Sequence, residues 1–175
     1  MSLENVSLQM QKKFEILDEM IAKGYIEPVK PLFSWLPTLC HYPNKTSNFH
    51  NAPQELKYQF NFMFSWYAFF LGIFAFTQIR LEKDFLIYLS IFTGIFSLIP
   101  PTQFDRVIEI GTSFYFSQIF VFSYYYQYQT YGRCASKRNI FQTICISLIY
   151  LFLIVIGSEI IQTILYHDIK RLFIK

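Results

Sequence analysis

Two glutamates lie inside long apolar stretches of the sequence, where an ionisable side chain could carry chemistry. Glu109 is in the first turn of the run 107–126, and Glu159 lies about 10 Å inside the end of the run 140–166 by helical rise. A carboxylate in hydrocarbon is costly, so it marks either an ion pathway or a paired charge. Arg106 precedes the run that contains Glu109, on the membrane side where the run with Glu159 ends. We therefore predict a buried Arg106–Glu159 pair and no proton relay.

Other residues with catalytic potential are poorly placed. All three histidines fall outside the apolar runs, which argues against haem ligation within a bilayer. Cys40, His41 and His50 could form a metal site, but a fourth ligand at zinc-finger spacing is missing. The sequence contains no Gly-rich phosphate loop, HExxH or GxSxG motif. We expect no enzyme activity, no cofactor and no bound metal.

The composition indicates a membrane protein. Charged residues make up 15% of the 175 residues, whereas about 25% is usual in soluble domains. Hydrophobic residues reach 53%, with 21 Phe and 13 Tyr, which leaves too few polar side chains to cover a water-exposed globule. These values exclude an ordinary soluble enzyme, a nucleic-acid-binding protein and a disordered tail. The net charge of +3 implies no polyanionic partner.

Four apolar runs would form the helices that position Glu109, Glu159 and Arg106. They cover 60–79, 85–99, 107–126 and 140–166. A membrane-spanning helix needs about 20 apolar residues, so the second run, which ends before Pro100-Pro101, is a short span. We predict an all-α, multi-pass protein with about four transmembrane helices in 60–175. Four spans would place both termini on the same side of the membrane.

Residues 1–59 are predicted to form a separate unit outside the bilayer. Apolar residues recur at helical spacing from Leu3 to Lys23, which predicts an amphipathic helix. A Pro-rich extended tether follows, from Tyr25 to Pro53. We expect Phe14, Leu17 and Trp35 to dock this unit against a partner subunit or the headgroup region.

Small residues predict how the first two spans pack. Because small side chains let helices approach closely in lipid, we expect two matched faces in an antiparallel hairpin, with Ala75 near Ser90. The faces consist of Ala68, Gly72 and Ala75 in the first span and Ser90, Gly94 and Ser97 in the second.

Basic residues near an aromatic belt are candidates for lipid contact. Arg133, Lys137 and Arg138 follow a Tyr-rich segment and could bind an anionic phospholipid headgroup, cardiolipin among them. The competing interpretation is an ordinary interfacial anchor.

In hydropathy and size, the whole chain resembles lineage-specific accessory subunits of mitochondrial respiratory complexes and ATP synthases, without a diagnostic motif. The resemblance implies a non-catalytic subunit of a respiratory-chain complex in the mitochondrial inner membrane, which would scaffold core subunits and lipids. Its partners would be other membrane subunits and phospholipids, with no nucleic acid. The alternatives are an accessory subunit of the mitochondrial ATP synthase, and a small independent transporter or channel of the endoplasmic reticulum membrane.

Overall fold

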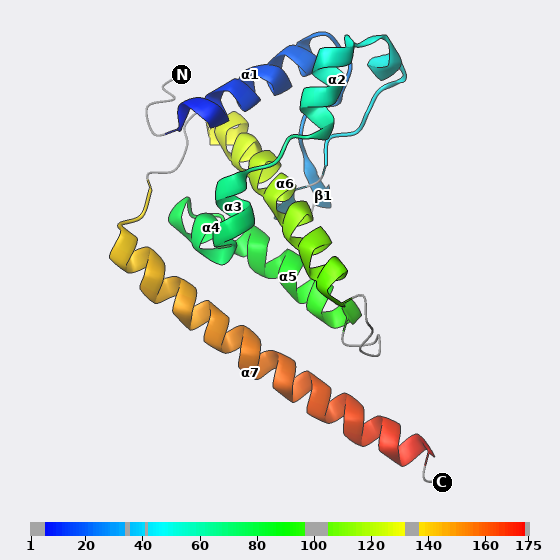
Figure 1. Cartoon of the computed structure of the whole chain (residues 1–175), viewed down its shortest axis with the longest axis vertical. Coiled ribbons are helices and arrows are strands. Elements are labelled where there is room, and N and C mark those ends of the chain that lie inside the picture. The colour runs from blue at the N-terminus through cyan, green and yellow to red at the C-terminus, as the bar shows by residue number, and fades with distance from the viewer. Residues whose placement is uncertain (1–5, 34–35, 41, 97–104, 132–136, 174–175) are drawn as a thin grey trace.

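The chain folds into a mainly helical structure, which confirms the all-α class, with one short β-hairpin added (Figure 1). The computed structural model describes residues 6–33, 36–40, 42–96, 105–131 and 137–173. The elements, in chain order, are α1 (Leu8–Ala22), β1 (Pro31–Phe33), β2 (Leu36–Cys40), the 3₁₀ helix η1 (Ser47–Asn51), α2 (Gln54–Asn61), α3 (Trp66–Leu71), α4 (Ile73–Gln78), α5 (Glu82–Phe96), α6 (Asp105–Tyr131) and α7 (Ile140–Phe173).

Helix α1 is the amphipathic helix that the sequence predicts, within shorter limits. Its N-cap is Ser7, whose hydroxyl accepts a hydrogen bond from the backbone N–H of Met10, and Gly24 follows its end with φ +68°. The apolar face of α1 packs on the C-terminal part of α6, where the Phe14 ring lies 5.3 Å from the Tyr125 ring. Residues of the predicted N-terminal unit and of the helical bundle thus share one core.

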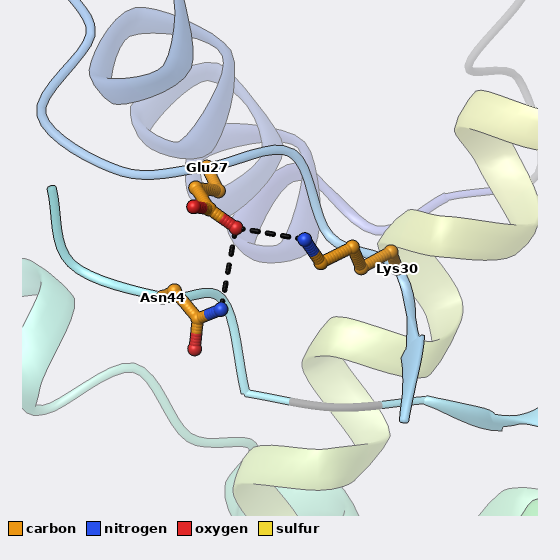
Figure 2. A network of polar contacts seen from close by, with 3 residues as sticks. All are labelled: Glu27, Lys30 and Asn44. Carbon is orange, nitrogen blue, oxygen red and sulfur yellow. Dashed lines mark hydrogen bonds and ion pairs between the residues drawn. The ribbon is translucent and has the colours of Figure 1, made fainter. Parts of the chain in front are cut away.

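The Pro-rich segment is extended, as predicted, but it forms an arm that folds back on itself. An antiparallel bridge joins Ile26 to Lys45, and β1 pairs with β2 beyond it. At the base of the arm, one carboxylate oxygen of Glu27 accepts hydrogen bonds from the side chains of Lys30 and Asn44 (Figure 2). These two donors hold the pKa of Glu27 below its usual value. Because β2 packs against α5 and α6, the arm is attached to the body.

The first predicted span, 60–79, is not one helix, and this prediction is wrong. Helix α2 ends at Asn61, and α3 and α4 are separated by Gly72, which has φ +44° and ψ −121°. Only glycine adopts such a backbone conformation readily. The hydroxyl of Tyr67 in α3 donates to the side-chain oxygen of Gln78 in α4, so the two helices fold back on each other. A sequence pattern of apolar residues alone does not reveal this reversal.

Helices α5 and α6 form the long axis of the body and run in opposite directions (Figure 1). Aromatic rings fill the space between them: the Phe85 and Phe116 rings are 5.0 Å apart, and the Phe92 and Tyr115 rings are 5.4 Å apart. The shared core is therefore built from the aromatic residues in which the sequence is so rich.

Helix α7 lies along one side of the body and extends beyond it (Figure 1). It packs on α4, and the side chains of Thr143 and Ser147, one turn apart, are buried at this contact. Tyr150 and Ile154, further along the same stripe, are partly buried against the core. The remaining sides of α7 are largely uncovered.

Candidate functional site

The exposed apolar surface of α7 is the most prominent candidate for function. Among the described residues, Ile140–Ile161 is the single segment long and apolar enough to cross a membrane, and only 6% of its most apolar stretch is buried. Its 22 residues measure about 33 Å, close to the thickness of a bilayer hydrocarbon core. Large side chains on several sides of α7 are exposed, among them the consecutive residues Leu151, Phe152 and Leu153. The core helix of a soluble protein would bury such residues.

Further exposed apolar residues lie on the body. They include Ile91 on α5, Val107 and Ile110 in the first turns of α6, and Phe70 on α3. In contrast, the second half of α6 is buried under α1 and the arm. Leu8 on α1 and Tyr58 on α2 are also exposed, but α7 carries more exposed large apolar side chains than any other element. Helices α5, α6 and α7 extend to the end of the molecule opposite α1 and α2 (Figure 1).

Arg138 anchors the start of α7 to the body. Its Nη2 lies 2.6 Å from Oε1 of Glu82, and its Nη1 donates to the carbonyl oxygen of Thr77 at 3.0 Å. Its backbone N–H also donates to the carbonyl of Gln78 at 2.8 Å. The guanidinium thus has partners within the chain, and the binding of a lipid headgroup by Arg138 stays a prediction. Lys137 is exposed, and Arg133 lies outside the described residues.

The predicted pair between Arg106 and Glu159 is not formed. Both side chains are exposed, and the structure gives them no ion pair with each other. The reason is that α7 packs on α4 and diverges from the first turns of α6. Glu159 lies in the last turn of the apolar segment that ends at Ile161, near one of its ends. A carboxylate this close to the end of a membrane-spanning segment would reach the headgroup region and would need no buried partner.

The small residues do not form the two matched faces that the sequence predicts. Ala68 and Ala75 are buried, but the break at Gly72 places them on different helices, with α3 against α6 and α4 against α7. Ser90 is exposed, Gly94 is half-buried, and Ser97 lies outside the described residues. The predicted register needs one continuous helix from Ala68 to Ala75, and the reversal removes it.

The predicted docking residues are used inside the chain. Phe14 and Leu17 are 1% and 0% exposed and belong to the core of the chain, and tyrosine rings of α6 contact Phe14. Their assignment to a partner subunit is therefore corrected. Trp35 and His41 lie outside the described residues, and no group of three His, Cys, Asp or Glu among the described ones could hold a metal ion.

Sequence reasoning missed two features that hold the candidate surface in place. The contact of Arg138 with Glu82 joins residues far apart in sequence and leaves no local pattern. The inward stripe of α7 has a signal, since Thr143 and Ser147 form a small-xxx-small spacing within an apolar run. No known family model, curated protein or solved structure matches this chain.

Proposed function

We propose that this protein is a non-catalytic accessory subunit of a respiratory-chain complex in the mitochondrial inner membrane. The observation that carries the membrane part of the proposal is α7, whose 22-residue apolar segment exposes most of its large side chains. Exposing so many large apolar side chains to water costs roughly 25 cal/mol per Å² of surface. Lipid or a neighbouring membrane subunit offsets this cost.

The α5–α6 hairpin accompanies α7 into the bilayer in this proposal. Both helices extend in the same direction as α7, and their exposed side chains include Ile91, Val107 and Ile110. Helices α3 and α4 fold back on each other at Gly72, so the chain enters and leaves this helix pair on the same side of the bilayer. One crossing, by α7, then replaces the four that the sequence suggests, because α7 contains the single described segment that is long and apolar enough to cross. The N-terminal cap, formed by α1, the arm and α2, lies on the side opposite the C-terminus.

A scaffolding role is supported by polar side chains of the body that hold its elements together. Arg138 with Glu82, and Tyr125 with Asp18 at 2.5 Å, join separate elements of the chain. The large uncovered faces of α5, α6 and α7 are suited to contact lipid and adjacent subunits. The assignment to a respiratory complex rests on the resemblance in hydropathy and size to its accessory subunits.

Native gel electrophoresis of the tagged full-length chain tests this proposal. Membranes of the source cell are solubilised in mild detergent, and the gel is stained for respiratory activity and probed for the tag. We expect the chain in purified inner membranes and in a band of high mass that carries the activity. Migration as a small species from the endoplasmic reticulum would overturn the proposal and favour an independent transporter or channel.

A further inference from the structure

A cavity of about 320 Å³ lies where α1, α3 and α6 meet. Residues at the end of α4 and Lys137, which precedes α7, complete its wall. Its volume falls at the lower end of the range for sites that bind small molecules. The cavity is separate from the exposed apolar surface of α7.

Two lysines line this cavity without an acidic partner. Lys13 of α1 is half-buried, and its Nζ donates to the carbonyl oxygen of Phe64, a neutral acceptor. Lys137 is exposed. The ion pairs of the described residues involve neither lysine, and the described lining residues include no carboxylate. Burial lowers the pKa of Lys13, which is the cost of holding an ammonium there without a counter-ion.

Uncharged donors accompany the two lysines. Ser7 and Ser65 line the cavity, and the hydroxyl of each accepts a hydrogen bond from a backbone N–H. A hydroxyl that accepts in this way keeps its proton for donation to a ligand. The side-chain amide of Gln78 also lines the cavity, and its oxygen accepts from Tyr67. The lining thus combines two positive charges with several donors, which is the chemistry that binds a phosphate group.

The position of the cavity is that of a membrane interface. Trp66 and Tyr67 line it and are 58% and 41% exposed, and such residues are enriched at the level of lipid headgroups. Lys137 comes shortly before Ile140, where the apolar segment of α7 begins. The exposed aromatic residues of α3 and the start of the apolar segment of α7 therefore both place the cavity at the level of the lipid headgroups.

From this arrangement we infer that the cavity binds the phosphate group of an anionic phospholipid, with Lys13 and Lys137 as its charged contacts. The acyl chains would leave past Trp66 along the exposed faces of α3 and α7. The inference rests on the proposed membrane anchoring, and it adds a ligand class and a site. It retains Lys137 from the predicted basic cluster and replaces Arg138 by Lys13.

Fluorescence of Trp66 in lipid nanodiscs tests the inference. The full-length chain with Trp35→Phe is placed in phosphatidylcholine discs that contain increasing fractions of phosphatidylglycerol or cardiolipin. We expect a saturable change in Trp66 emission. The double variant Lys13→Gln, Lys137→Gln should weaken the apparent affinity by about tenfold or more, since each charge-assisted hydrogen bond contributes over 1 kcal/mol. The control Lys12→Gln, Lys83→Gln removes the same charge from exposed positions outside the cavity and should leave the affinity unchanged.

Four results would overturn the inference. A chain that inserts stably but shows no preference for anionic lipid, or equal loss in both double variants, removes the site while the proposed function stands. Failure to insert into any disc removes both proposals. Inorganic phosphate and glycerol 3-phosphate are added to pure phosphatidylcholine discs as a separate arm. A lysine-dependent response to them alone would assign the cavity to a soluble phosphate compound.

Discussion

Arg138 joins the start of α7 to one stretch of the chain that is distant in sequence, 77–82, because it contacts Glu82, Thr77 and, through its backbone, Gln78. The Arg138 and Glu82 side chains are 18% and 12% exposed, so solvent screens their attraction only weakly. Removing one partner of such a pair leaves a buried charge without compensation.

We predict that Arg138→Met lowers the free energy of unfolding by about 3 kcal/mol, because it strands the Glu82 carboxylate. The measurement is thermal or denaturant unfolding of the purified chain in detergent. Adding Glu82→Gln to Arg138→Met should recover part of the loss, since no charge is then left unpaired. An Arg138→Met variant as stable as the original would show that the contact does not hold α7 to the body.

Gly72 is a second residue on which the fold depends. A Cβ at this position would meet nothing within 4 Å, so any cost of Gly72→Ala comes from its φ of +44°. We predict a destabilisation of about 1–3 kcal/mol, measured by unfolding in detergent. Gly94→Ala is the matched control, because Gly94 is helical and also has space for a methyl group. That change should be neutral or stabilising by up to about 1 kcal/mol. Equal effects of the two changes would argue for a continuous helix through Gly72.

At the scale of elements, the docking of α1 on α6 decides whether the cap is ordered. The Phe14 ring lies within 5.6 Å of three tyrosine rings of α6, counted between centroids. We predict that Phe14→Ala costs about 3–5 kcal/mol and increases hydrogen exchange throughout α1, while the chain stays in the membrane. Leu8→Ala changes a residue of the same helix that is 76% exposed, and it should have little effect. Unchanged exchange in Phe14→Ala would mean that α1 is held by something other than this aromatic cluster.

The elements differ in how far the sequence predicts them. The amphipathic spacing of α1, the extended Pro-rich arm and the apolar run of α7 are local patterns, and each is found in the structure. The break at Gly72 was missed because an apolar run carries no signal of a backbone reversal. The sequence predicts that Phe14 is buried, but it does not predict that α6 covers it, because α6 approaches α1 only through tertiary packing. The same holds for Arg138, whose partner Glu82 lies on another helix.

At the scale of the whole molecule, helices α1 and α2 of the cap and the C-terminal end of α7 lie at opposite ends (Figure 1). A membrane around the apolar segment of α7 would therefore separate them. Helix α7 contains the single described segment that is long and apolar enough to cross, and the reversal at Gly72 breaks the first of the four crossings that the hydropathy pattern suggests. An odd number of crossings places the cap and the C-terminus on different sides.

Cysteine accessibility tests this central claim most directly. In a background with Cys40, Cys134 and Cys145 changed to Ser, Lys12→Cys reports on the cap and Lys175→Cys reports on the C-terminus. Each variant is treated with a membrane-impermeant maleimide in sealed vesicles of uniform orientation, before and after permeabilisation. We predict that one of the two cysteines is labelled in intact vesicles and that the other is labelled only after permeabilisation. Labelling of both from the same side would contradict this account and restore the four-span arrangement.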